Sequence, residues 1–236
     1  MFERSAPALA DIGAALEDVH THSDVVAGTV RLNVPANVAR TVLPGLLPPF
    51  LRAHPQVRVE VTVEDSFVDI LSSGADAGIR YEERLEQDMI AVPIGPRTQR
   101  LVTAAAPSYL AARGRPVHPR DLLDHDCLRL RFSSGALAGW EFERDGETIV
   151  LDPRGPLLVR PGSASDLLVE AAVAGTGIVC LFEDWLAPHI PCGALERLLD
   201  DWTAPFSGPL LYYSGRRQVP PALRAFIDFM RVRHTV

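Results

Sequence analysis

The chain has 236 residues, of which 47% are hydrophobic and 22% charged, and its formal net charge is −7. This composition indicates an ordinary globular protein with room for one large domain or two lobes, and it excludes collagen-like and disordered classes. The acidic balance makes the chain by itself a poor candidate for binding a nucleic-acid backbone, which favours basic surfaces.

The three cysteines, Cys127, Cys180 and Cys192, are odd in number and form no CxxC pair. This pattern argues against a disulfide framework and against a zinc site. We expect all three to be small buried hydrophobic residues. Because no stretch resembles a signal peptide or reaches the roughly 18 apolar residues of a membrane span, we expect a cytoplasmic protein.

The first segment, residues 2–23, has apolar residues spaced three and four apart, which predicts a helix with one apolar stripe. The stripe is as narrow as a coiled-coil seam, and the other faces carry Asp, Glu and His. We expect residues 1–24 to form a linker and dimerisation helix that pairs with another chain or domain, although packing on its own domain stays open. The expected contact residues are Leu9, Ile12, Leu16 and Val19.

Residues 28–80 alternate between strand and helix patterns. Strands are predicted for TVRLNV after Gly28, for 57–63 and for 76–80, and helices for 37–53 and 65–74. Pro44 should bend the first of these helices, and the Pro48-Pro49 pair should disrupt it further. This β-α-β-α-β order predicts a parallel sheet with helices on both faces.

A second alternating series follows, and the chain then returns to the first lobe at its end. Its predicted strands cover 89–95, 99–105, 127–132, 155–160, 178–182 and 209–214, with a hairpin at 140–152 that turns at Asp145-Gly146. Its predicted helices cover 107–114, 118–125, 163–175 and 220–233. We therefore expect two α/β lobes in series.

Catalytic signatures are absent from the sequence, including G-x-S-x-G, H-E-x-x-H and the Walker A motif. Gly175-Thr176-Gly177 follows a helix and precedes a strand, which indicates a turn and not a phosphate loop. The acidic stretch 121–127 around His125 is predicted to be a surface loop with a capping role, because sequence neighbours point apart and cannot converge on a metal. Glu64, Asp65 and Asp69 lack a partner that would raise the pKa of one carboxyl. We expect no catalysis, no cofactor and no metal.

A binding cleft is the remaining candidate, since ligands of open α/β sheets lie beyond the carboxyl ends of the strands. Asn37 and Ser66 are predicted N-caps whose helix starts, with Arg80 or Arg131, suit a small carboxylate. Aromatic side chains would wall an apolar body. Alternatives stay open, because Asn37 and Ser66 could only cap, Arg80 could pair with Asp76 or a nearby Glu, and Phe132 could belong to the core. The candidate residues at these strand ends are Pro35, Ala36, Asn37, Asp65, Ser66, Phe67, Arg80, Tyr81, Arg131 and Phe132.

Several of these stretches, taken in order over about residues 28–234, resemble the effector-binding domain of LysR-type transcriptional regulators. They are GTVRLNVP, LPGLLPPFLRAHPQVRVEV, DILSSGADAGIR, AAPSYLAARGRPVHPRDLLDHDCL, the WEFERDGE hairpin, AAVAGTGIVCL and LRAFIDFM. The segment 2–23 resembles the linker helix that joins this domain to a winged helix-turn-helix in that family. The winged helix-turn-helix itself has no counterpart in this sequence, and we expect truncation.

The resemblance implies two Rossmann-like α/β subdomains joined by two crossover strands, similar to type 2 periplasmic binding proteins and preceded by a linker helix. Subdomain I would comprise 28–98 and 205–236, and subdomain II would comprise 99–204. The domain would bind a small effector between the subdomains, form homodimers or homotetramers, and contact DNA only through the absent N-terminal reader. It also implies that Ser163 and Ser165, which open a helix, face the effector together with the strand-end residues above.

Two other functions remain as alternatives. A stand-alone metabolite-binding protein of the same fold would have no use for the helix at 2–23, and a periplasmic form would need a signal peptide. An enzyme on a doubly wound fold would need catalytic motifs that the sequence lacks.

Overall fold

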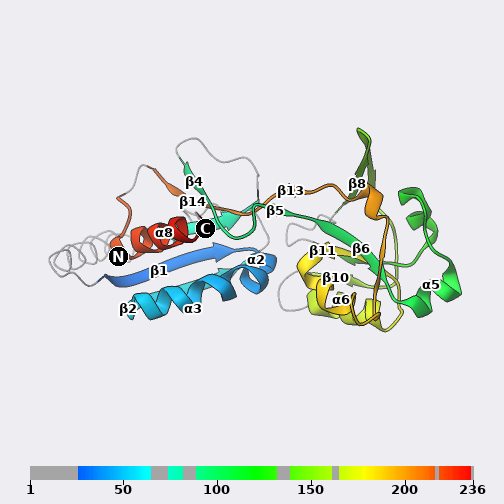
Figure 1. Ribbon diagram of the computed structural model, residues 1–236, viewed down its shortest axis with the longest axis horizontal. Coiled ribbons are helices and arrows are strands. Elements are labelled where there is room, and N and C mark those ends of the chain that lie inside the picture. Colours follow the sequence, from blue (N-terminus) through cyan, green and yellow to red (C-terminus); the bar gives the residue numbers. More distant parts are fainter. Residues whose placement is uncertain are drawn as a thin grey trace, which may run out of the picture.

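The computed structural model describes residues 26–64, 74–81, 89–131, 139–160, 165–215 and 218–234. Within them the chain forms two α/β lobes connected by two short extended segments (Figure 1). The predicted helix at 2–23 and nearly all of the one at 65–74 lie outside the described residues.

Lobe I is built on a five-stranded sheet in the order β2-β1-β3-β14-β4. The first three strands are parallel, and β14 is antiparallel to both of its neighbours. Two helices, α3 and α8, contact each other through the Phe50 ring, which lies 5.0 Å from that of Phe226. The elements are β1 (Ala27–Val34), α2 (Ala36–Thr41), α3 (Leu43–Ala53), β2 (Gln56–Val63), β3 (Ala77–Arg80), β4 (Met89–Pro93), β14 (Leu210–Ser214) and α8 (Pro221–His234).

Lobe II repeats this arrangement in the order β10-β7-β11-β6-β12, with three parallel strands followed by an antiparallel pair. The helices are α5 (Pro107–Arg113), α6 (Ser165–Val173) and α7 (Glu183–Leu186), with 3-10 turns η2 (Pro119–Asp124), η3 (Ala187–His189) and η4 (Asp200–Trp202). The strands are β6 (Leu101–Ala105), β7 (Cys127–Leu130), β8 (Trp140–Arg144), β9 (Glu147–Leu151), β10 (Leu158–Val159), β11 (Ile178–Phe182) and β12 (Glu196–Leu198).

Alternation along the strands of lobe II divides its core into two layers, one on each face of the sheet. In β11, Val179 and Leu181 join the layer that α6 and α7 complete, whereas Ile178 joins the layer under α5 and the β8–β9 hairpin. The hairpin turns at Asp145-Gly146 as predicted, with Gly146 at φ 82. Both faces of this sheet are therefore covered, as the sequence predicts for an α/β lobe.

The strands β5 (Thr98–Gln99) and β13 (Phe206–Ser207) carry the chain between the lobes and pair with each other in antiparallel fashion. The strand that follows β5 in sequence is β6, which is fourth in the sheet of lobe II. The strand that follows β13 is β14, which is fourth in the sheet of lobe I. The fold is that of two subdomains with two crossover strands, and the lobes can move relative to each other only by changing these segments and the contacts beside them (Figure 1).

The proline-rich segment 42–53 departs from the prediction in one respect. The helical stretch does break, at Val42, and Pro44 lies in the first turn of α3, where a missing N–H costs nothing. Pro48 and Pro49, however, lie inside α3 without ending it. The carbonyls that the missing N–H groups of these two prolines cannot bind belong to Pro44 and Gly45, which are both exposed, and the expected disruption does not occur.

Candidate functional site

The helix α2 begins at the carboxyl end of β1, as predicted, but Asn37 does not cap it. Pro35 occupies the N-cap position in an extended conformation, with φ −72 and ψ 156, and no side chain caps the helix. Asn37 is the second residue of α2 and is only 5% exposed. The N-cap prediction for Asn37 was therefore wrong, because its side chain bonds to groups outside the helix.

The Asn37 side-chain amide forms three hydrogen bonds, through both of its N–H groups and its oxygen. Its Nδ2 donates to the Tyr81 hydroxyl at 2.6 Å and to Gln99 Oε1 at 3.3 Å, and its Oδ1 accepts from Trp185 Nε1 at 2.7 Å. An indole N–H can only donate, so Trp185 fixes which way the amide faces. Tyr81 follows β3, Gln99 lies in β5 and Trp185 in α7, so one side chain joins lobe I, the crossover and lobe II.

Arg40, one turn further along α2, makes a second set of contacts with lobe II. Its guanidinium lies 4.0 Å from the centre of the Trp185 ring, a cation–π arrangement. It also forms an ion pair with Asp166 in the first turn of α6. The start of α2 in lobe I thus contacts the start of α6 and the short helix α7 in lobe II.

Three aromatic rings line the same junction near the crossover. Tyr81 stacks on Phe182 with ring centroids 5.2 Å apart and an interplanar angle of 27°. Phe206 of β13 lies 5.9 Å from each of them. Residues from lobe I, lobe II and the crossover therefore form one aromatic cluster next to Asn37. We call Asn37, Arg40, Tyr81, Gln99, Asp166, Phe182, Trp185 and Phe206 the interlobe junction.

Nε2 of Gln99, a residue only 7% exposed, and Nε of Arg131, directly after β7, are two of the buried N–H groups that have no hydrogen-bond partner among the described residues. A buried donor without an acceptor costs about 1–3 kcal/mol. Such groups are rare in folded proteins, and each is a candidate for binding an acceptor that is not part of the chain.

Arg80 has a structural partner that differs from the one the sequence suggested. It is buried and donates to the Asn33 carbonyl at 3.2 Å, to Asn33 Oδ1 at 2.6 Å and to its neighbour Ile79's carbonyl at 2.7 Å. Pairing with Asp76 was the wrong alternative, since Asp76 accepts from the main-chain N–H of Arg31 and burial raises the pKa of its carboxyl. Arg80 therefore ties β3 to β1 within lobe I.

The remaining predicted site residues fall into two groups. Ser165 is buried at the first position of α6, beside Asp166, and Arg131 is half-buried, with its main-chain N–H bound to the Val159 carbonyl. Pro35 and Ala36 lie at the start of α2. The others lie outside the described residues: Asp65, Ser66, Phe67, Phe132, Ser163 and the helix positions Leu9, Ile12, Leu16 and Val19.

Several residues of the interlobe junction were not among the predicted site residues, namely Arg40, Gln99, Asp166, Phe182, Trp185 and Phe206. A signal was available for two of them, because Phe182 ends the predicted strand 178–182 and Trp185 comes shortly after it, which is the criterion that selected Arg80 and Tyr81. Gln99 and Phe206 had no such signal, because their place depends on how β5 pairs with β13.

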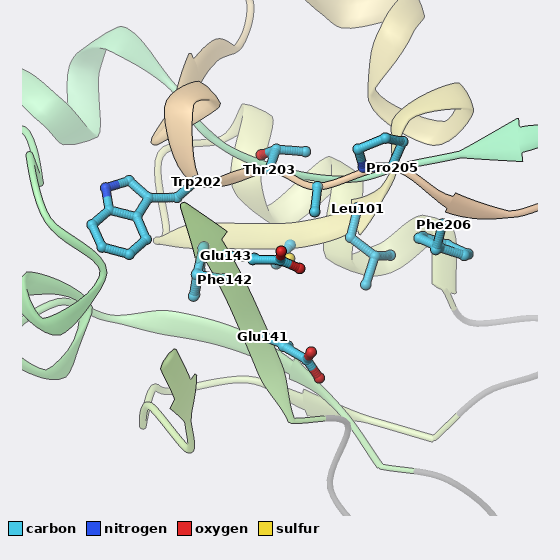
Figure 2. A pocket seen from close by; sticks show the side chains of 10 residues that line it. Leu101, Glu141, Phe142, Glu143, Trp202, Thr203, Pro205 and Phe206 are labelled. Carbon is cyan, nitrogen blue, oxygen red and sulfur yellow. The ribbon is translucent and has the colours of Figure 1, made fainter. Parts of the chain in front are cut away.

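A pocket of about 260 Å³ lies in lobe II, between β8 and the segment 202–206 that leads into the crossover (Figure 2). Phe142, Trp202 and Phe206 form apolar walls, and the exposed residues Glu141 and Glu143 bring two carboxylates to it. Two negative charges repel an anion and favour a cation. This pocket is therefore unsuited to a carboxylate ligand, although Phe206 links it to the interlobe junction.

A second pocket, of about 210 Å³, lies beside α7 and contains Arg197. This arginine already forms ion pairs with Glu183 and Asp200, and its hydrogen bond to Asp200, with that to Glu183, raises its pKa. Its charge is thus balanced within the protein, and the pocket offers little to an anion.

The structure shows the surroundings of the cysteines and of the acidic stretch 121–127. All three cysteines are free, and burial raises the pKa of the Cys127 thiol to about 12, but Cys192 is exposed, contrary to expectation. In the part of the chain that the structure describes, no group of three or more His, Cys, Asp and Glu side chains is placed to hold a metal. Asp121 accepts from the N–H groups of Val117 and His118, which confirms the capping role predicted for this stretch. None of the described helices is long and apolar enough to cross a bilayer.

Comparison with known proteins places these features in a family. Residues 23–234 match the model of the LysR substrate binding domain. A Pseudomonas aeruginosa protein named as a putative transcriptional regulator is 40% identical, and the match covers 94% of this chain and 71% of that protein. YcaN, an uncharacterized HTH-type transcriptional regulator of Escherichia coli, is 36% identical, and the match covers 98% of this chain and 74% of YcaN. The full-length Vibrio cholerae virulence activator AphB, a member of the LTTR protein family, matches the fold with a TM-score of 0.79 at 22% identity, covering 98% of this chain and 77% of AphB.

Proposed function

The chain belongs to the LysR-type transcriptional regulators through its substrate-binding domain, and on this premise we propose that it binds a small organic carboxylate at the interlobe junction. Binding would change how the two lobes sit and so modulate DNA binding by a winged helix-turn-helix in the cytoplasm. No catalytic step is part of this proposal.

The observation that supports the carboxylate is the presence of two buried side-chain donors, one in the crossover strand β5 and one directly after β7. Gln99 Nε2 and Arg131 Nε have no acceptor among the described residues, and a carboxylate has two oxygens that accept strongly from such groups. The pocket beside β8 carries Glu141 and Glu143 and would repel the same ligand. Charge therefore favours the junction over the pocket.

The proposed site combines residues from both lobes. Pro35, Ala36, Asn37 and Tyr81 would contribute from lobe I, and Arg131 and Ser165 from lobe II. Arg80 would act as a positioning residue, because its guanidinium holds β3 against Asn33 of β1. The site would be completed by five residues outside the described ones: Asp65, Ser66, Phe67, Phe132 and Ser163.

The mechanism would be a shift between arrangements of the lobes. A ligand changes such an equilibrium only by the difference in its affinity for the two states, so it must contact both lobes in one arrangement and not in the other. Residues such as Asn37, which already bonds to both lobes and to the crossover, are suited to this task. We also propose that the helix at 1–24 pairs chains into homodimers or homotetramers.

A thermal-shift screen tests the proposal, since a ligand that binds only the folded state raises its melting temperature. Aromatic and aliphatic carboxylates should raise it, and the corresponding amides should not. Arg131→Gln, which removes the charge but keeps a polar side chain, should reduce the shift, with Arg154→Gln, an exposed arginine elsewhere in lobe II, as the control. A screen in which no acid shifts the native protein would contradict the proposed ligand class.

A further inference from the structure

Trp185 belongs to lobe II yet completes the polar network of lobe I. Its ring packs in the lobe II core with α6 and β11, and the residue is 5% exposed. Its Nε1 nevertheless donates to Asn37 Oδ1, 148 residues away in sequence, at 2.7 Å. The Arg40 guanidinium covers the ring at 4.0 Å. The indole therefore contacts the two polar side chains of α2 that face lobe II.

These contacts use the atoms that a ligand at the junction would need. Asn37 Oδ1 and the Arg40 guanidinium are both engaged by Trp185, whereas the neighbouring Gln99 Nε2 is buried and has no acceptor among the described residues. The amide of Gln99 bonds to Asn37 through its other atom, Oε1. The group of Asn37, Arg40 and Gln99 is thus satisfied by an indole on one side and lacks an acceptor on the other.

We propose that Trp185 is an internal occupant of an effector subsite formed by Asn37, Arg40 and Gln99. Its indole keeps the two lobes closed on each other. The indole leaves the subsite when a flat aromatic acid with a ring N–H binds there. This inference rests on the proposed effector function and names both the regulation and the ligand class of that site.

The ligand class follows from what the departure of Trp185 leaves behind. Asn37 Oδ1 loses its donor, and a buried acceptor without a partner is costly, so the incoming molecule must carry an N–H. Arg40 loses a π face, which a flat aromatic ring restores. A carboxylate on that ring supplies the oxygen that Gln99 Nε2 lacks. An aromatic acid with a ring N–H meets all three requirements.

The contacts of Trp185 with Asn37 and Arg40, which we call the latch, also set the apparent affinity of the protein for its ligand. A ligand that binds only the open arrangement has its apparent dissociation constant raised by the inverse of the open fraction. Loss of the Trp185–Asn37 hydrogen bond should raise that fraction about fivefold, the factor that corresponds to a typical net hydrogen bond. Trp185→Phe, which keeps the ring and removes the N–H, should therefore tighten binding.

The first experiment needs no ligand and uses spin labels to measure the distance between the lobes. One label is attached to the exposed native Cys192 of lobe II and the other to Arg52→Cys on the exposed side of α3 in lobe I, in a Cys180→Ser background with excess unlabelled protein. Trp185→Phe should widen the distance distribution. Trp140→Phe, an equally conservative change at a buried tryptophan of lobe II, should leave it narrow. An unchanged distribution in Trp185→Phe would overturn the latch.

The second experiment uses indole-3-carboxylate and its N-methyl derivative, which differ only in the ring N–H. Binding is measured by calorimetry on the whole chain, and the indole N–H signals of the three tryptophans are followed by NMR, with Trp185→Phe assigning one of them. The N–H acid should bind at least about fivefold more tightly than the N-methyl acid. It should also move the Trp185 signal toward that of an unbonded indole.

The outcomes separate this inference from the proposed function. If both acids bind equally and the Trp185 signal stays, the effector function stands and the occupant role of Trp185 is wrong. If Trp185→Phe loosens the lobes but neither acid binds, the latch stands and the ligand class is overturned. If, in addition, no carboxylate shifts the melting temperature, the proposed function fails while the latch still stands.

Discussion

The interlobe junction and the pocket beside β8 both place polar groups against aromatic rings, and they share the neighbourhood of Phe206. In the junction, the Asn37 amide bonds to residues of both lobes and of the crossover. In the pocket, Glu141 and Glu143 are exposed at a surface of lobe II alone. The difference teaches that an open pocket is not by itself the better candidate. A ligand that is to change the lobe arrangement must compete for the contacts that now hold it.

The largest expected effect concerns the crossover that both regions adjoin. A Cβ added to Gly208 would lie 1.8 Å from the carbonyl oxygen of Pro96, which belongs to the other crossover segment. Gly208→Ala should force the two segments apart at a cost of about 3 kcal/mol, the upper end for overpacking. Urea unfolding of the whole chain measures it. Gly45→Ala, with nothing near its Cβ in α3, is the control and should stabilise slightly. If Gly208→Ala and Gly45→Ala have the same free energy of unfolding, the close approach of Gly208 to Pro96 does not hold the two crossover segments in place.

The next effect separates the junction from the pocket directly. Asn37→Ala removes three hydrogen bonds and leaves the Trp185 N–H without an acceptor, so it should cost about 2 kcal/mol of unfolding free energy. Thr203→Ala in the pocket loses only a 3.5 Å contact with the Leu199 carbonyl and should cost under about 0.5 kcal/mol.

Carboxylate affinity distinguishes two residues of the interlobe junction, Asn37 and Trp185. Asn37→Ala should weaken binding, whereas Trp185→Phe should tighten it, although both break the same hydrogen bond. The signs differ because Asn37 is proposed to bind the effector and Trp185 to compete with it. Calorimetric affinities that move in the same direction in the two variants would contradict the distinction.

The sequence predicted the lobes better than the junction, and the reason is the range of the interactions. The strand after Gly28 and the Asp145-Gly146 turn are predicted from local patterns, and the structure shows both. The partners of Asn37 are 44, 62 and 148 residues away, so no local pattern could show that they bond to Asn37. Trp185 lies in the four-residue helix α7, which is too short to leave a periodic signal. The N-cap expectation for Asn37 failed for the same reason, because long-range partners outcompeted the local bond.

A smaller effect is expected from the ion pair between Arg40 and Asp166, which crosses the junction. The side chains are 39% and 62% exposed, so the pair is worth only about 0.2–1 kcal/mol. Asp166→Asn should open the lobes slightly in the spin-label measurement, and added salt should produce a similar change in the native protein. Glu170→Gln, one turn along the exposed side of α6, is the matched control. If Glu170→Gln opens the lobes as much, the effect comes from the charge of α6 and not from the pair.

The smallest effect should come from the pocket. Glu141→Gln with Glu143→Gln removes two negative charges from the pocket with little change in side-chain shape. If carboxylates bind at the junction, their affinity should change by less than about twofold, since exposed charges at a distance are screened by salt. If they bind in the pocket, removing two repulsive charges should raise affinity by tenfold or more, because each 1.4 kcal/mol of lost repulsion is a factor of ten. The near-absence of an effect is thus an informative result, because it would place the anion at the junction, where the two lobes meet.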